Sequence, residues 1–198
     1  MGSKPDTPAF QDEFTREFMK SSEEVEDGYY EFESKTGGYT MLFPVTGEMQ
    51  KSRYFYDDET GKVEDTLFID SDDDILRSVR TRYDARARNA DDIEARQRSL
   101  SRSVSYEGEY EEIEADGKTI YYAKNEYHVQ VEDKEGTSYS FFGYVKSNEH
   151  SRGLSLAYEV SCRDKAKPCD LDLDLAEERA KKLMKAVQFK QKSVGSEE

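Results

Sequence analysis

The sequence has little of what builds a large apolar core and little of what most often carries catalysis. Tryptophan is absent, apolar residues make up 35%, and only two histidines and two cysteines occur in 198 residues. No apolar run approaches the ~18–20 residues that a membrane-spanning helix needs, and no signal peptide is visible at the start. These absences exclude a membrane-spanning helix and leave little room for a histidine-based active site.

The charge balance is strongly acidic. There are 44 Asp and Glu against 29 Lys and Arg, which gives a formal net charge of −15. Such a chain repels nucleic acid, so we expect no nucleic-acid partner. Gly37-Gly38 is too short to be a glycine-rich phosphate loop, and we expect no cofactor.

Hydrophobic periodicity predicts strands, one helix, further strands and a final helix. Alternation with a period of two, which is typical of half-buried strands, is seen in residues 29–34, 39–43, 53–57, 63–69, 75–83, 109–115, 119–131, 139–146 and 154–162. Helices are expected over 89–104, with Asp91 as the N-cap, and from Asp172 or Asp174 to about Val187. We expect a turn at Gly136 between the strands on either side of it. This order predicts an α+β fold, an antiparallel β-sheet flanked by helices.

The domain boundaries follow from the same pattern. We expect residues 1–27 to form an N-terminal tail with a short helix, 28–190 to form a single α+β domain, and 191–198 to be a disordered tail. In the first segment Phe10, Phe14 and Phe18 recur every four residues, on one face of a helix. We favour packing of this stripe on the chain's own domain over binding of a partner.

The two cysteines, Cys162 and Cys169, are separated by six residues that include Pro168. A zinc site wants four ligands, and a redox motif has only two residues between its cysteines. A local structural disulfide between the end of a strand and the start of a helix fits better than two unpaired thiols. A disulfide implies export from the cytoplasm.

The acidic run Asp70–Asp74 is the best candidate for a metal site. Its carboxylates are ligands for a hard cation, but Ile75 stands where a calcium loop needs glycine and Thr81 where it needs glutamate. We expect a solvated turn and no metal. His128 in a strand and His150 in a polar loop lack an accompanying nucleophile motif, so we predict no catalytic residue.

Arginine is concentrated in one segment. Eight arginines and no lysine lie between Arg77 and Arg102, whereas lysine outnumbers arginine elsewhere by 16 to 5. Arg80 and Arg82 share the outward face of a strand, near the helix that carries Arg96 and Arg98. We favour pairing of these side chains with the protein's own carboxylates. The alternative is an anion-binding site made by Arg80, Arg82, Arg96 and Arg98, since arginine presents a planar fork to phosphate and carboxylate.

Two stretches resemble PsbP-like domains. Residues 30–44 (YEFESKTGGYTMLFP) resemble their opening aromatic hairpin, and residues 180–189 (AKKLMKAVQF) resemble their closing helix. The resemblance implies an antiparallel sheet between helices.

A closer similarity is to the YvcA-like lipoproteins of Bacillus, through residues 8–13 (PAFQDE), 41–44 (MLFP), 139–147 (YSFFGYVKS) and the spacing of the two cysteines. None of these is a chemical motif. The resemblance implies an export signal, a lipid-modified cysteine before Met1, and a link to colony or biofilm architecture. The chain lacks that cysteine, and because Met1-Gly2-Ser3 is typical of an introduced start, we expect the native N-terminus to lie upstream.

These observations predict a non-enzymatic binding or scaffolding module. It is anchored through lipid to the outer face of the membrane of a Gram-positive cell, with a cell-wall polymer or an envelope protein as partner. One alternative is a metal-dependent envelope hydrolase that uses Asp70–Asp74. Another is an intracellular protein-interaction domain, which requires Cys162 and Cys169 to be free thiols.

Overall fold

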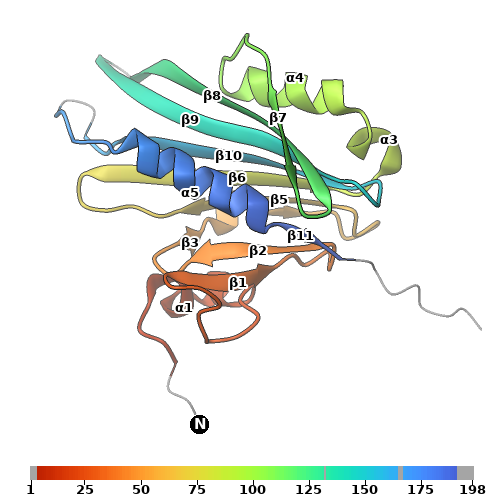
Figure 1. Cartoon of the computed structure of the whole chain (residues 1–198). Helices are drawn as coiled ribbons and strands as arrows, with labels where there is room; N and C mark the ends of the chain where they lie inside the picture. The colour runs from red at the N-terminus through yellow and green to blue at the C-terminus, as the bar shows by residue number, and fades with distance from the viewer. Residues whose placement is uncertain (1–3, 132, 165–166, 191–198) are drawn as a thin grey trace, which may run out of the picture.

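The computed structural model describes residues 4–131, 133–164 and 167–190, which form two antiparallel sheets and a few helices (Figure 1). The large sheet has the order β3-β5-β6-β10-β9-β8-β7, with β4 paired to β5, and the small sheet has the order β1-β2-β11. The large sheet contains β3 (Glu48–Met49), β4 (Phe55–Tyr56), β5 (Val63–Ile69), β6 (Ile75–Asp84), β7 (Glu111–Ala115), β8 (Lys118–Val131), β9 (Lys134–Ser147) and β10 (Gly153–Cys162). The small sheet contains β1 (Tyr29–Glu33), β2 (Tyr39–Pro44) and β11 (Gln188–Phe189). The predicted α+β class with an antiparallel sheet is confirmed.

The helices lie on both faces of the large sheet. They are α1 (Pro8–Gln11), α2 (Glu13–Arg16), α3 (Ala87–Ala90), α4 (Ile93–Ser103) and α5 (Leu173–Ala186), together with a 3-10 turn at Lys51–Arg53. In Figure 1, the small sheet lies below the large sheet, and α3 and α4 lie above it. Helix α5 packs on the same side as the small sheet, because its buried residues share one core with β1 and β2. The large sheet is therefore the middle layer of the molecule.

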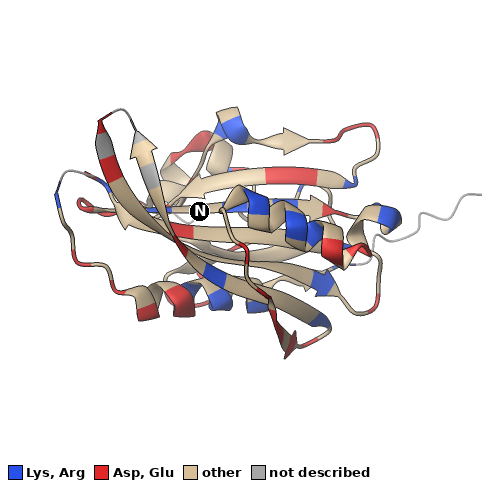
Figure 2. Cartoon of the chain, turned by 90° about the horizontal axis from the view of Figure 1, so that it is seen from above, with Lys and Arg blue, Asp and Glu red and all other residues tan. Residues whose placement is uncertain are grey.

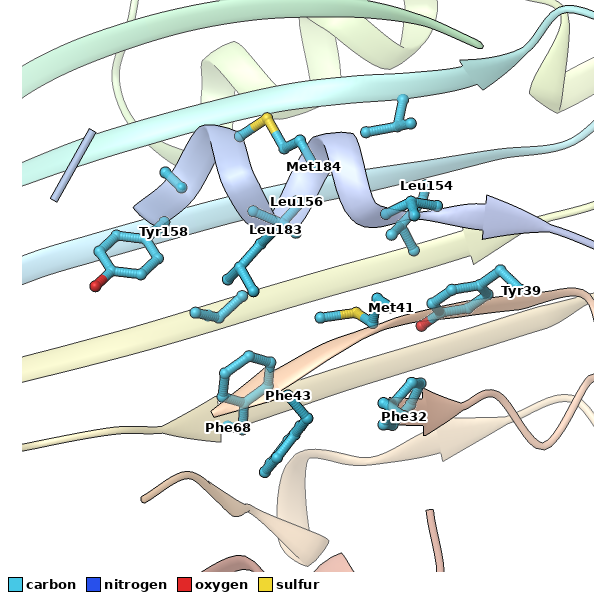
Figure 3. Packing of buried hydrophobic residues seen from close by; sticks show 14 of the residues in the cluster. Phe32, Tyr39, Met41, Phe43, Phe68, Leu154, Leu156, Tyr158, Leu183 and Met184 are labelled. Carbon is cyan, nitrogen blue, oxygen red and sulfur yellow. The ribbon is translucent and has the colours of Figure 1, made fainter. Parts of the chain in front are cut away.

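The main core lies between the large sheet and the layer formed by α5 and the small sheet. Strand β10 contributes Leu154 and Leu156, α5 contributes Leu183 and Met184, and all four are buried (Figure 3). Aromatic rings of the small sheet fill the space opposite them. The buried rings on this side are Tyr30, Phe32, Tyr39 and Phe43. Aromatic side chains bury large areas, which compensates for the low apolar content of the sequence.

A second, smaller core lies under α4. Leu100 and Val104 of this helical segment pack on Phe142 and Tyr144 of β9. The Tyr144 hydroxyl donates a hydrogen bond of 2.6 Å to the carbonyl oxygen of Ala90 in α3. These contacts hold α3 and α4 over β9, on the face opposite to the main core.

The N-terminal segment is part of the main core. Phe10 and Phe18 are buried, as the predicted packing of the phenylalanine stripe requires. Phe18 stacks on Phe32 of β1, with ring centroids 5.3 Å apart. The expected single helix is instead two short turns, because Asp12 has an extended backbone and its carboxylate accepts a hydrogen bond from the Thr15 amide to cap α2.

The strand predictions agree with the structure wherever the alternation is long. The hairpins β1–β2 and β4–β5, the strand β6 and the strand β10 lie where they were expected. Three details were wrong. The single helix expected over 89–104 is two helices, α3 and α4, with a break at Asp91 and Asp92. Gly136 pairs with Val129 inside the β8–β9 ladder and makes no turn, and α4 is capped by Asp92, whose carboxylate accepts from the Ala95 amide, and not by Asp91.

The C-terminal helix follows its prediction closely. The Asp172 carboxylate accepts a hydrogen bond from the Leu175 amide and caps α5. The expected buried face is confirmed for Ala176, Ala180, Leu183 and Val187. The tail predicted over 191–198 lies outside the described residues.

The predicted disulfide is present. Cys162, the last residue of β10, is bonded to Cys169, with Cα atoms 5.6 Å apart. The bond ties the end of the central strand to the segment that leads into α5. It closes a short loop and so limits the conformations of the unfolded chain.

We predict that Phe18→Ala lowers the free energy of unfolding by about 3 kcal/mol, since it leaves a cavity between Phe32 and the N-terminal segment. Urea denaturation measures the change. The matched control is Val25→Ala, whose side chain is exposed and whose loss should change stability by less than about 0.5 kcal/mol. Equal, small effects of both substitutions would show that the N-terminal segment is a free tail.

We predict that Cys162→Ser with Cys169→Ser lowers the free energy of unfolding by about 2–3 kcal/mol, the entropy of closing a loop of this length. Urea denaturation measures the change. Reducing the disulfide of the wild type with a thiol should lower its free energy of unfolding by the same amount. The double variant should not respond to the reductant. An unchanged denaturation midpoint on reduction would contradict the expectation.

Candidate functional site

Arg80 and Arg82 project from the face of the large sheet that α4 covers. Their register partners on β10 are Ala157 and Ser155, and Ala157 belongs to the small core under α4. Paired residues of an antiparallel ladder share a face. The prediction that the two arginines point the same way, near the following helix, therefore agrees with the structure.

A groove of about 320 Å³ lies between α4 and the strands β5, β6 and β10. Its basic lining residues are Arg53, Arg80, Arg82 and Arg96, and its acidic lining residue is Asp65. Leu67, Leu100 and Ala157 give it an apolar floor. Figure 2 looks onto this face, where α4 crosses the sheet with basic segments along its length.

Two of the four arginines pair with the protein's own acids. Arg80 donates to a Glu159 carboxylate oxygen at 2.9 Å, and Arg82 donates to Asp65 Oδ2 at 2.8 Å. The two arginines and the two acids in these pairs remain partly exposed, with 20% to 47% of each side chain accessible. Pairs of this kind contribute little to stability, so their arginines remain available to another anion.

The other two arginines have no acidic partner among the described residues. Arg96 projects from α4, and its Nε is buried without a hydrogen-bond partner in this part of the chain. Arg53 ends the 3-10 turn before β4 and is exposed. An unpaired buried donor is unfavourable. Because no acid among the described residues pairs with Arg53 or Arg96, the groove also has a surplus of positive charge that an anion would neutralise.

Arg53 was not found from the sequence, because it lies outside the arginine-rich segment. The pairing of β4 with β5 brings it to the groove. Phe55, two residues further on, pairs with Asp65 and shares its face of the sheet. Its ring is 52% exposed at the outer end of the row that runs through Asp65 and Arg82.

Arg98 does not line the groove. Two residues along a helix correspond to a rotation of about 200°, so Arg96 and Arg98 point to opposite sides of α4. Arg98 lies 3.7 Å from Glu94 and faces a shallow surface depression beside Tyr106.

Asp65 is a second residue of the groove, besides Arg96, whose hydrogen bonding is incomplete among the described residues. Oδ2 accepts from Arg82, whereas Oδ1 is buried and has no donor among the described residues. Burial raises the pKa of the Asp65 carboxyl, and the charge of Arg82 opposes the rise. The groove thus contains one acceptor and one donor, Arg96 Nε, that are each left without a partner.

The acidic run Asp70–Asp74 is a cross-linked turn. Asp72 accepts a 2.7 Å hydrogen bond from Arg77, and Asp70 accepts one of 2.6 Å from the Thr46 hydroxyl. Within the described ranges, no three His, Cys, Asp or Glu residues are placed to hold a metal ion together. These hydrogen bonds favour a turn held by the chain's own donors over a cation site.

Neither histidine is among the residues that line the groove. His128 Nδ1 is 3.4 Å from the Thr137 hydroxyl on the neighbouring strand. His150 lies in the loop before β10, with Nε2 3.9 Å from the Glu149 carboxylate. Among the described helices, none is long and apolar enough to cross a bilayer.

Comparison with known proteins identifies relatives along most of the chain. Residues 5–188 match the family model described as "Putative lipoprotein YvcA". The chain is 34% identical over 190 residues to the protein of that name from Bacillus subtilis (strain 168), covering 93% of this chain and 78% of the relative. A crystal structure from Bacteroides thetaiotaomicron is similar to 82% of this chain with 12% identity and a TM-score of 0.45. The similar part is 48% of that chain, about half its length. A similarity this weak does not establish a shared fold or function.

We predict that calcium and manganese leave the melting temperature unchanged, because a cation would have to displace the hydrogen bonds that Asp72 accepts from Arg77 and Asp70 from Thr46. A cation that bound only the folded state would raise the melting temperature in a saturable way. Differential scanning fluorimetry with increasing metal concentration measures this. A rise that disappears in Asp72→Asn with Asp74→Asn would refute the prediction.

Proposed function

The chain belongs to the YvcA lipoprotein family, and we propose that it is a non-enzymatic, extracytoplasmic module that binds an anionic ligand in the groove between α4 and β6. The family supports a surface lipoprotein with a lipid anchor to the membrane. The disulfide supports an oxidising compartment, because such bonds are rare in the cytosol. The groove supplies the binding site.

The unpaired arginines carry the proposal. The protein has a net charge of −15, yet four guanidinium groups surround one groove with one acid in its lining. Glu159 neutralises Arg80 from outside the lining, and Asp65 neutralises Arg82. The charges of Arg53 and Arg96 remain as a surplus of two. Charge-assisted hydrogen bonds to such groups are about twice as strong as neutral ones.

The position of the groove indicates where the ligand comes from. Helix α1 lies on the side of the small sheet, where the Ala9 amide donates to the Val45 carbonyl oxygen. Helix α4 covers the opposite face of the large sheet (Figure 1). A lipid anchor preceding the N-terminal segment would leave the groove facing away from the bilayer. A cell-wall polymer or an envelope protein is therefore a better candidate than the anchoring membrane, and a role in colony or biofilm architecture would act through it.

The two alternative functions have weaker support. A metal ion at Asp70–Asp74 would have to compete with Arg77 for Asp72 and with Thr46 for Asp70. An intracellular interaction domain requires two free thiols, whereas Cys162 and Cys169 are bonded.

We predict that teichoic acid, a phosphodiester polymer, binds the wild type at low salt and that Arg96→Gln weakens binding about tenfold, the loss of one charge-assisted hydrogen bond. Arg80→Ala with Arg82→Ala should weaken it further. Isothermal titration calorimetry at low and moderate salt measures the affinity, which should fall as screening increases.

The matched control is Arg98→Gln, which removes the same charge from the other side of α4. It should bind like the wild type. Vesicles containing anionic lipid form a second arm and should bind more weakly than the polymer. No binding of either probe at low salt, or equal losses in Arg96→Gln and Arg98→Gln, would refute the proposed site.

A further inference from the structure

The groove presents more than positive charge. It combines unpaired guanidinium groups with a carboxylate oxygen that lacks a donor among the described residues, and the exposed ring of Phe55 lies next to that carboxylate, as the strand partner of Asp65. We infer that its ligand is a sugar that carries a phosphate group. This inference rests on the proposed anion-binding function and names the chemical class of its ligand.

The unpaired arginines favour phosphate over carboxylate. Arg96 reaches the groove from α4, and Arg53 reaches it from the segment before β4, so the two guanidinium groups belong to different walls. A carboxylate offers two oxygens in one plane, which suits a single arginine fork. The tetrahedral oxygens of a phosphate accept hydrogen bonds from several directions, and so suit donors on separate walls.

Asp65 requires a ligand that also donates hydrogen bonds. Its carboxylate repels a bare anion, which makes it an unfavourable lining residue for a simple phosphate site. The inference requires the Asp65 side chain to rotate on binding, because Oδ1 is buried without a donor among the described residues, although 31% of the side chain is exposed. A sugar hydroxyl donates to such an oxygen, and an ionised carboxylate acts only as an acceptor.

Phe55 provides an apolar surface at the end of the same row. An aromatic face carries partial negative charge, and it attracts the positively polarised C–H groups on the face of a sugar ring. A phosphate without a ring leaves Phe55 without a role.

The size of the groove agrees with one sugar ring. Ligand pockets are about 300–1,000 Å³, and 320 Å³ lies at the lower end of this range. Leu67 and Leu100 add apolar surface to the lining, beside arginines that stay partly exposed to water. The groove therefore favours a single phosphorylated unit, free or at one position of a polymer.

Calorimetric titration of the whole chain with four small probes tests the inference. The probes are inorganic phosphate, glucose, glucose 6-phosphate and glucuronate. We expect glucose 6-phosphate to bind about tenfold more tightly than phosphate, glucose to show no binding, and glucuronate to bind more weakly than glucose 6-phosphate. Glucuronate binding as tight as that of glucose 6-phosphate would overturn the assignment of phosphate.

Two variants distinguish the contribution of the sugar ring to binding from that of the phosphate group. Phe55→Ala should weaken glucose 6-phosphate binding several-fold and leave phosphate binding unchanged. Asp65→Ala should reduce the preference for glucose 6-phosphate over phosphate, because phosphate binding improves when the carboxylate is removed. Val25→Ala, an exposed apolar residue outside the groove, is the matched control and should change neither affinity. Circular dichroism confirms that each variant is folded.

The inference and the proposed function fail in different ways. If phosphate binds in an Arg96-dependent manner and glucose 6-phosphate binds no more tightly, the anion site stands and the sugar is ruled out. If neither the small probes nor teichoic acid bind at low salt, both are wrong. If the Asp65 and Phe55 variants keep the wild-type preference, the assignment of these two residues is overturned.

Discussion

The packing of β10 on both of its faces is the constraint on which the rest of the structure depends. One face carries Leu154, Leu156 and Tyr158 into the main core. The other face carries the small side chains of Ser155 and Ala157 toward α4. Because β10 pairs with both β6 and β9, any change in its register would move both layers at once.

The groove is a consequence of the sizes of neighbouring side chains. Large rings at Phe142 and Tyr144 support α4 over β9. On β10 the corresponding side chains are small, and on β6 they are long arginines with polar ends. The helix thus rests on one half of the sheet and leaves a gap over the other half. Since the arginines line this gap, the choice of internal neutralisation or anion binding is not exclusive: Arg80 and Arg82 are neutralised, and Arg53 and Arg96 are not.

The sequence was most informative where the hydrophobic pattern is long and local. Strand β10 and helix α5 each contain four matching apolar positions, and both were predicted within a residue or two. Strand β3 has only two residues, too few for any period to be visible. Asp91 and Asp92 are equivalent by residue type, and only the hydrogen bond to the Ala95 amide distinguishes them. Arg53 reaches the groove through strand pairing, which no local pattern encodes. The separation of Arg96 from Arg98, by contrast, follows from helix geometry alone.

The place of β10 in the chain has a consequence for how the protein folds. The strand is central in the large sheet but comes after all the other strands of that sheet in sequence. Until residue 162 is available, the β5–β6 hairpin and the β7–β8–β9 meander have no strand to join them, and each alone has one open edge where β10 belongs. Long-range pairing of this kind is slow compared with local hairpin formation. A chain that is threaded through a membrane from its N-terminus could therefore complete the large sheet only after almost its whole length had crossed.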